Sequence, residues 1–279
     1  MNDELLRIAD LQFLFSFDGF PKIELPPSYD AFTEVKKESN PLMFSFLAAI
    51  SLPKIKGKRV FSTEIWELYA TKKGYFLKVC FPDSSFPPPR VGIFSSDFSE
   101  GEIFCSPLLV NPLYTPLDQL LMVNILANGK GLLIHGAGLN IDGRGILFAG
   151  KSNSGKTTMA RLCKNEKNAV VLSDDRVILR KIKNRFFIYG TPWHGELEEV
   201  SNQGVPLDKI YLLNHGSKNL MVQLKGSQAI GQFLRFAILP FWNHEGMRFI
   251  LKFSEQLVKE IPCNKLYFVP DKDIINQIL

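Results

Sequence analysis

The chain has 279 residues, of which 46% are hydrophobic and 22% are charged, and its formal net charge is +5. This composition is ordinary for a soluble globular protein, and the length suffices for one large domain or two modest ones. The positive charge is spread along the sequence. Its densest patch, residues 180–185, straddles a predicted hairpin turn without any nucleic-acid-binding motif, so we expect no nucleic-acid partner.

The four cysteines lie far apart, without C-x-x-C spacing, and most have apolar neighbours. We expect buried free thiols, as in a reducing cytoplasm. The first residues are acidic and lack the basic and apolar regions of a signal peptide. No run of about 18 apolar residues occurs, which argues against a membrane span. The sequence therefore predicts a soluble, cytoplasmic protein with no membrane partner.

Residues 1–113 contain no catalytic motif. Runs rich in aromatic and β-branched residues predict strands at 11–17, 63–69, 75–81 and 90–94. We expect a small, strand-rich N-terminal domain that acts either in recognition or assembly, or as a structural cover for the rest of the chain.

Prolines at 112 and 116 indicate a domain boundary, which gives predicted domains of residues 1–113 and 114–279. Thr115 is suited to cap a helix that has Pro116 at its first position. The apolar residues that follow, from Leu117 to Leu126, recur on one helical face, and Gly129 is a typical helix end.

Two strands are predicted next, at residues 132–141 and 144–149, on either side of Asp142-Gly143, which is a strong hairpin signal. Residues 150–157, GKSNSGKT, then match the phosphate-binding pattern G-x-x-x-x-G-K-[ST], and residues 157–163 predict a helix. The phosphate loop thus grows from an antiparallel hairpin. The expected fold class is α/β, with a mixed, largely antiparallel sheet core that carries the P-loop, plus the small strand-rich N-terminal domain.

The loop residues meet specific physical demands. Gly150 and Gly155 allow the backbone to wrap closely round a phosphate chain, and the loop N–H groups and the helix dipole stabilise its charge. Lys156 would reach the outer phosphates and Thr157 would ligate Mg²⁺. The expected nucleotide-binding residues are Gly150, Lys151, Ser152, Asn153, Ser154, Gly155, Lys156, Thr157 and Thr158.

Residues 169–172 predict a short buried strand that ends at Ser173-Asp174-Asp175. Carboxylates at a strand end beside a phosphate loop suit a magnesium ion and an attacking hydroxyl. We expect Asp175 to hold the metal with Thr157, and Asp174 to accept the proton of the hydroxyl. The two aspartates could exchange these roles.

A second hairpin is predicted over residues 176–189, then strands at 206–213 and 220–224 and helices at 227–239 and 245–260. The acidic stretch 195–199 either begins a helix or holds a metal or a basic substrate. Three side chains in this half are candidates for the site: His194 for lining it, and Arg235 and Arg248 for neutralising charge. His215 and His244 are expected on the surface, and no ligand spacing predicts zinc.

The order of a strand carrying His135, a hairpin turn, the phosphate loop and Ser-Asp-Asp resembles the kinase domain of the HPr kinase/phosphorylase family, which has a phosphoenolpyruvate-carboxykinase-like fold. It is more similar still to HPr-kinase-related proteins of bacterial lasso-peptide-type modification clusters, in which segments like 190–195 and 266–271 recur. The resemblance covers roughly residues 115–279. It implies that His135 lies beside the phosphates and, with Lys156 and Asp174, is catalytic.

The resemblance implies an ATP-dependent, Mg²⁺-dependent kinase acting on a hydroxyl, which we expect to be a Ser of a peptide or small protein. HPr kinases carry an Arg-containing signature after the second hairpin that this chain lacks, which weakens HPr as the substrate and also the phosphorylase activity. Their hexameric assembly makes a homo-oligomer possible. The alternative is a P-loop ATPase or nucleotide-binding switch that moves a partner protein. A degenerate, nucleotide-binding kinase is a weaker hypothesis, since Lys156, Thr157 and both aspartates are intact.

Overall fold

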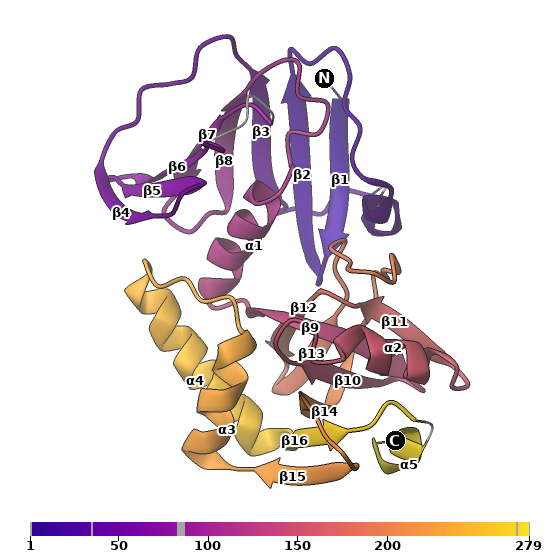
Figure 1. Cartoon of the computed structure of the whole chain (residues 1–279). Helices are drawn as coiled ribbons and strands as arrows, with labels where there is room; N and C mark the ends of the chain where they lie inside the picture. The colour runs from indigo at the N-terminus through magenta and orange to yellow at the C-terminus, as the bar shows by residue number, and fades with distance from the viewer. Residues whose placement is uncertain (1, 35, 83–86, 272, 279) are drawn as a thin grey trace. The chain divides into compact units, whose positions relative to one another are not determined.

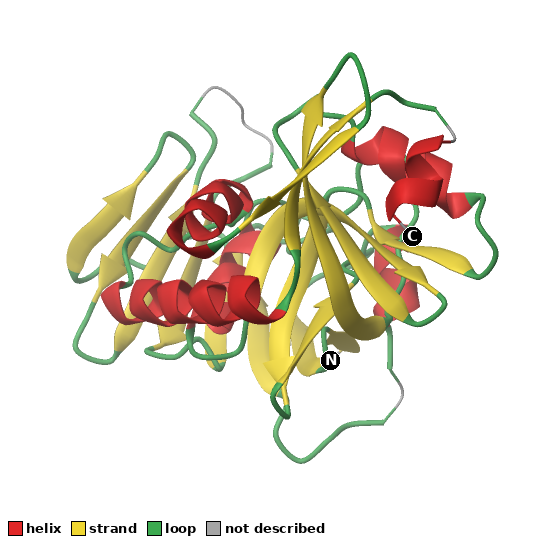
Figure 2. Ribbon diagram, turned by 90° about the horizontal axis from the view of Figure 1, so that it is seen from below, coloured by secondary structure: helices red, strands yellow, loops and turns green. Residues whose placement is uncertain are grey.

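The computed structural model describes residues 2–34, 36–82, 87–271 and 273–278. The chain divides into two compact units: Met1–Arg7 with Leu11–Asn128, and Ile8–Asp10 with Gly129–Leu279. The strands form two eight-stranded sheets, and helices accompany them (Figures 1 and 2). The predicted mixed α/β class is confirmed at this level.

The first unit is built on a sheet of strand order β1-β2-β3-β8-β7-β6-β5-β4. Strand β3 pairs in parallel with both β2 and β8, and the strands from β8 to β4 pair antiparallel. Its core is rich in phenylalanine, because alternate positions of β2 and β3 point phenyl rings to one face. The strands are β1 (Asn2–Ile8), β2 (Leu11–Asp18), β3 (Leu42–Ala48), β4 (Lys58–Ser62), β5 (Trp66–Ala70), β6 (Gly74–Val79), β7 (Arg90–Ser95) and β8 (Glu100–Cys105), and the short helix η1 spans Pro27–Phe32.

Helix α1 (Leu117–Ala127) groups with this first unit. The Tyr29 hydroxyl donates to Asp118 at 2.8 Å, and the guanidinium of Arg90, which is 1% exposed, donates to the carbonyl of Pro112 at 3.2 Å. The expected Thr115 cap is wrong. Pro116 stands at the cap position without a side-chain bond, and nearly every residue of the helix is buried rather than one face. Tertiary packing on all sides here replaces the local capping that the sequence suggested.

The second unit carries the sheet β10-β9-β12-β13-β14-β16-β15, with β11 paired to β9. Strand β10 also pairs with β14 in parallel, so β9, β10, β14, β13 and β12 form a closed ring. The strands are β9 (Leu132–Ile141), β10 (Arg144–Ala149), β11 (Ala169–Ser173), β12 (Arg176–Ile182), β13 (Arg185–Tyr189), β14 (Gly204–His215), β15 (Leu220–Leu224) and β16 (Cys263–Phe268).

Both predicted hairpins of this unit are confirmed. Asp142 and Gly143 have φ of 52° and 78°, and Lys183 and Asn184 have φ of 47° and 64°. A two-residue turn with both φ values positive matches the right-handed twist of the strands it joins. The residue pairs of these turns therefore set the register of the hairpins.

Helix α2 (Lys156–Lys164) and helix α5 (Asp273–Ile278) pack against one face of the sheet. Helix α4 (His244–Glu260) begins at Asn243, whose side chain accepts from the Gly246 N–H. The helix predicted over residues 227–239 is shorter: α3 (Gly226–Phe233) ends in the 3₁₀ turn η2 (Leu234–Phe236). It stops there because Ala237 bridges to Ile134 and the Ile238 N–H donates to Leu133, so that the chain joins strand β9.

The four cysteines are free thiols, and burial raises the pKa of Cys105, Cys163 and Cys263 to about 12. This agrees with the predicted buried thiols. Among the described residues, no helix combines the length and the apolar character needed to cross a bilayer.

Substitution of Phe148 tests the contribution of core packing to the stability of the second unit. The Phe148 side chain is 0% exposed and stacks on Tyr211, with ring centroids 5.6 Å apart. Because Phe148→Ala removes buried apolar surface and leaves a cavity, we expect it to lower the free energy of unfolding by about 3–5 kcal/mol. Urea unfolding of this variant measures the loss. Leu251→Ala, at a position 48% exposed, serves as control with an effect within about 0.5 kcal/mol. Equal losses in the two variants would contradict this account of the core.

Candidate phosphate-binding site

The predicted phosphate loop joins β10 to α2, which confirms the strand–loop–helix setting of the motif. Gly155 has φ of 95°, in the left-handed region that glycine adopts without strain. A Cβ at Gly150 would lie 2.1 Å from Oγ of Ser154. Glycine is therefore suited to both positions, by its backbone conformation at Gly155 and by the side chain of Ser154 that packs against Gly150.

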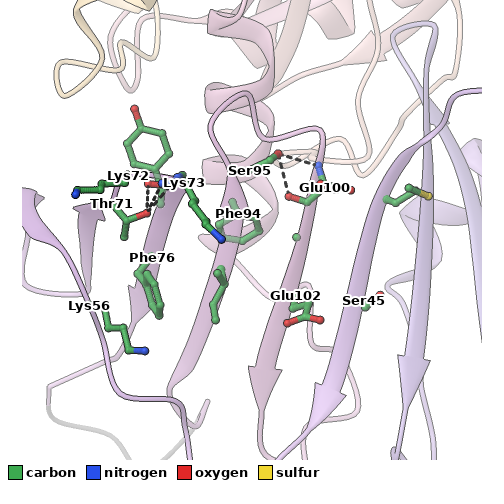
Figure 3. A pocket seen from close by; sticks show the side chains of 15 residues that line it. Ser45, Lys56, Thr71, Lys72, Lys73, Phe76, Phe94, Ser95, Glu100 and Glu102 are labelled. Atoms are coloured by element: carbon green, nitrogen blue, oxygen red, sulfur yellow. Dashed lines mark hydrogen bonds between the residues drawn. The ribbon is translucent and has the colours of Figure 1, made fainter.

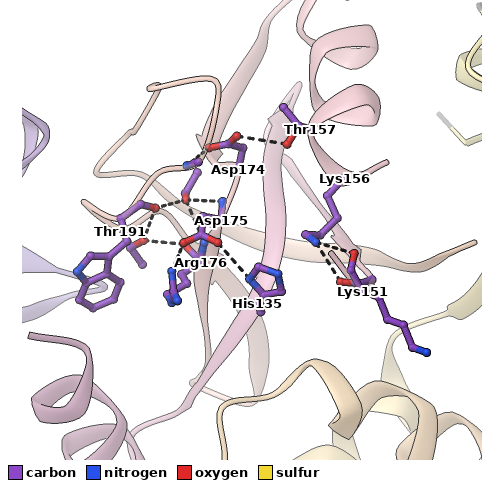
Figure 4. Close-up of polar contacts among 12 residues, drawn as sticks. His135, Lys151, Lys156, Thr157, Asp174, Asp175, Arg176 and Thr191 are labelled. Atoms are coloured by element: carbon purple, nitrogen blue, oxygen red, sulfur yellow. Dashed lines mark hydrogen bonds and ion pairs between the residues drawn. The ribbon is translucent and has the colours of Figure 1, made fainter. Parts of the chain in front are cut away.

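Lys156 is 8% exposed, and its ammonium donates to the carbonyl oxygens of Gly150 and Lys151, both at 3.0 Å (Figure 4). Burial lowers its pKa, and the charge of Asp174 opposes that shift. The lysine thus spans the loop from its C-terminal end back to its first residues. This is the place from which its charge would meet the outer phosphates.

The outer wall of the loop is held by two residues from neighbouring strands. Nε2 of His215, at the end of β14, donates to the carbonyl of Asn153 at 2.6 Å. The His215 ring stacks on Phe268, whose own ring lies where a Cβ at Gly155 would be, at 2.4 Å. His215 is exposed, as predicted, but its contact with the loop was not expected from the sequence.

Asp174 is 2% exposed and lies on the other side of the loop. Its carboxylate accepts from the backbone N–H groups of Gly195, at 2.6 Å, and Leu197, at 3.1 Å. The Thr157 hydroxyl is 3.5 Å from Oδ2 of the same carboxylate. A hydroxyl and a carboxylate oxygen so close together form a fitting set of hard oxygen ligands for Mg²⁺.

Asp175 has a different setting, although it is the next residue. Its carboxylate pairs with the guanidinium of Arg176 and lies 3.1 Å from Nδ1 of His135 (Figure 4). Burial, Lys156 and Arg176 together lower the pKa of His135 to about 4. At neutral pH this histidine is therefore uncharged, and it orients Asp175 by donating its Nδ1 hydrogen.

A buried hydroxyl supports the turn between the aspartates and the next strand. Oγ of Ser173 donates to the Trp193 carbonyl at 2.6 Å and accepts from the N–H groups of Asp175 and Arg176. Thr191 donates to the carbonyl of Arg176 at 2.6 Å. The segment after the second hairpin is thus tied to both aspartates, a role of residues 191–197 that the sequence did not reveal.

The remaining candidates lie in other settings. His194 is exposed, and its Nδ1 contacts the carbonyl of Gly195 at 3.1 Å. The acidic stretch does not begin a helix; instead Glu196 and Glu199 pair with Arg161 and Lys164 of α2. In the described part of the chain, no three His, Cys, Asp or Glu side chains gather into a metal-binding group.

The two candidate arginines differ in their surroundings. Arg248 is 77% exposed on α4 and pairs with Glu245. Arg235 lies on η2 and lines a pocket that also borders residues 151–154 of the phosphate loop. Of the two arginines, Arg235 therefore lies near the phosphate loop and Arg248 does not line this pocket.

The first unit has a hollow of its own, of about 840 Å³, on the open face of its sheet (Figure 3). Lys56, Lys72 and Lys73 line it together with Glu100 and Glu102, so its charge is mixed. At the tip of strands β7 and β8, the Ser95 hydroxyl donates to the Glu100 carbonyl and accepts from the Glu100 N–H. These groups are therefore bonded to each other. Nothing in it resembles the chemistry of the phosphate loop.

The model of a protein family described as SynChlorMet cassette protein ScmC matches residues 117–266, which is just over half of the chain. The chain belongs to this family. No curated protein matches it. Among solved structures, the Hpr(Ser) kinase/phosphatase from Coxiella burnetii matches 52% of this chain and 90% of its own, with 16% sequence identity and a TM-score of 0.30.

The depressed pKa of His135 predicts a pH dependence of stability. In the unfolded chain histidine has a pKa of about 6.5, whereas the folded value is about 4. Protonation therefore favours the unfolded chain: the contribution of His135 is complete above about pH 6.5 and is lost as the pH falls toward 4. Chemical denaturation between pH 4 and 7 should show a steeper loss for the wild type than for His135→Gln. Parallel pH profiles would show that the ring titrates normally in the fold.

Proposed function

We propose that this protein is an ATP-dependent, Mg²⁺-dependent kinase that transfers the γ-phosphate to a hydroxyl, a Ser of a peptide or small protein. The observation that carries the proposal is that two sets of polar groups lie beside the phosphate loop (Figure 4). Thr157 with Asp174 forms one of them, and Asp175 with His135 forms the other. The resemblance of the motif order to HPr kinases, and with it a phosphoenolpyruvate-carboxykinase-like core, supports the same chemistry.

The loop would bind the phosphates of the nucleotide and neutralise their charge. Its N–H groups and the N-terminus of α2 would hold the phosphates, and Lys156 would offset charge on the outer ones. The Thr157 hydroxyl and the Asp174 carboxylate would hold Mg²⁺, which neutralises charge on the phosphate oxygens when it is bound.

Asp175 is the better placed of the two aspartates to act on the acceptor. It is bound by side chains rather than by backbone N–H groups, and its side chain is 20% exposed. As the acceptor oxygen bonds to phosphorus and the bond to the bridging oxygen breaks, Asp175 would take the hydroxyl proton and ADP would leave. This assignment exchanges the roles first expected from the sequence, and it rests on the short distance between Thr157 and Asp174.

A matched pair of variants distinguishes the two assignments. Asp175→Asn should keep Mg²⁺-dependent nucleotide binding and lower phosphate transfer by at least about 100-fold, within the range of general-base effects. Asp174→Asn should instead weaken the dependence of ATP binding on Mg²⁺. Transfer is measured with labelled ATP and peptides encoded beside this gene, and binding by calorimetry with and without Mg²⁺. The opposite pattern would restore Asp174 as the base. Free phosphate that no peptide diminishes would favour the ATPase or switch.

Lys156→Ala tests the loop itself. Because it removes the buried ammonium that reaches the start of the loop, we expect it to abolish nucleotide binding or transfer while the fold is retained. Thermal unfolding controls for folding, and Lys164→Ala, at a partly exposed position on the same helix, is the matched control with unchanged ATP affinity. Normal ATP binding by Lys156→Ala would contradict the proposed site.

A further inference from the structure

A second pocket borders the phosphate loop on the side away from Asp174. Its volume is about 290 Å³, and its walls are residues 151–154 of the loop, residues 212–215 at the end of β14, η2 and Lys265 of β16. The parallel pairing of β10 with β14 produces this arrangement, because it brings the carboxyl ends of both strands to the same edge. In open parallel sheets, ligands bind beyond the carboxyl ends of the strands, and β10 and β14 form such a parallel pair within this mixed sheet.

The pocket is positively charged. Lys151, Arg235 and Lys265 line it, and no carboxylate occurs among its described lining residues. Within the described part of the chain, none of these three cations forms an ion pair; the ammonium of Lys265 lies over the ring of Tyr267, 4.9 Å from its centroid. Three such cations around a small hollow favour an anionic occupant.

A buried hydroxyl also points to a ligand. Ser154 lines the pocket and is 7% exposed, and its Oγ has no hydrogen-bond partner among the described residues. A hydroxyl left without a partner in a buried place is costly, and a ligand that accepts a hydrogen bond there would remove that cost. The three cations are suited to contact oxygen atoms of an anion, and the Ser154 hydroxyl, which is covered and lies against Gly150, adjoins them.

The position of the pocket identifies which substrate brings the anion. Lys156 reaches back to the carbonyls of Gly150 and Lys151, which marks this end of the loop as that of the outer phosphates. The pocket is lined by residues 151–154, next to the carbonyls that the Lys156 ammonium reaches. It therefore borders the end of the loop at which the acceptor hydroxyl would meet the γ-phosphate.

Strand β9 connects this pocket to the acceptor side. The segment after η2 bridges to β9 through Ala237 and Ile134, directly beside His135. Arg235 is thus two residues from a point of contact with the strand that carries the partner of Asp175. A peptide whose hydroxyl lies at Asp175 would extend toward the pocket at about 3.3–3.6 Å per residue.

We propose that this pocket binds a carboxylate side chain of the acceptor, so that the enzyme selects a hydroxyl with an acidic residue a few positions away. The inference rests on the proposed kinase function and names its substrate class. Arg235 would form a forked pair with the carboxylate, and Lys265 and Lys151 would add charge. The Ser154 hydroxyl would donate to the same group or to a water that bridges to it.

Paired peptide pools test the proposal. Each pool has a central Ser among degenerate positions, with Glu at one scanned position, and the matched pool has Gln there. Binding of the dye-labelled pools is followed by fluorescence anisotropy with a non-hydrolysable ATP analogue and Mg²⁺, and transfer is followed with labelled ATP. At one position we expect Glu to be favoured over Gln by at least about 10-fold, the scale of one charge-assisted hydrogen bond.

Arg235→Gln and Lys265→Gln should each reduce this preference to less than about 3-fold, with the KM for ATP unchanged. Arg144→Gln, at an exposed position at the start of β10, is the control that should keep it. Glu and Gln pools that bind alike would overturn the proposal, whether or not transfer occurs. It would also be overturned if the variants raised the KM for ATP and left the preference intact, since the pocket would then serve the nucleotide. Selective binding without transfer to any pool would leave the pocket assigned and overturn the kinase function instead.

Discussion

The site depends on the two different neighbours of strand β10. Its antiparallel pairing with β9 sets Ala149 opposite Gly136, so that His135 lies next to the start of the phosphate loop. Its parallel pairing with β14 sets the same Ala149 opposite Leu212, so that His215 reaches the outer wall of the loop. One strand end therefore gathers the groups proposed for catalysis on one side and a cationic pocket on the other. Any shift of register in β10 would move both sets relative to the phosphates.

The adjacent aspartates acquire separate surroundings for a similar geometric reason. Both residues lie in the bend between β11, which ends at Ser173, and β12, which begins at Arg176, and this bend directs their side chains to different neighbours. The carboxylate of Asp174 is directed to the N–H groups of residues 195 and 197, whereas that of Asp175 is directed to His135 and Arg176. Two chemically equal side chains can thus serve two functions, because one is enclosed by backbone donors beside Thr157 and the other remains partly open.

Local chemistry allowed much of this arrangement to be predicted. Asp142-Gly143 and the glycines of the loop have conformational requirements that can be read from neighbouring residues alone, and both hairpins agree with them. What could not be predicted depends on contacts between distant segments. The pairing of β10 with β14, the bond from His215 to Asn153 and the early end of helix α3 at residue 233 all arise from tertiary pairing. Strands β1, β3, β4 and β8 were also missed, although alternate positions of β3 are buried as a half-buried strand requires.

The ring of Phe268 occupies the space that a side chain at Gly155 would need, although the two residues lie on segments far apart in the chain. The phosphate-loop motif and strand β16 therefore depend on each other structurally. In a chimaera that combined this phosphate loop with a C-terminal strand from another protein, the side chain in the place of Phe268 would not fit against Gly155. A fragment ending before β16 would likewise carry an intact motif in a loop that lacks one of its supports.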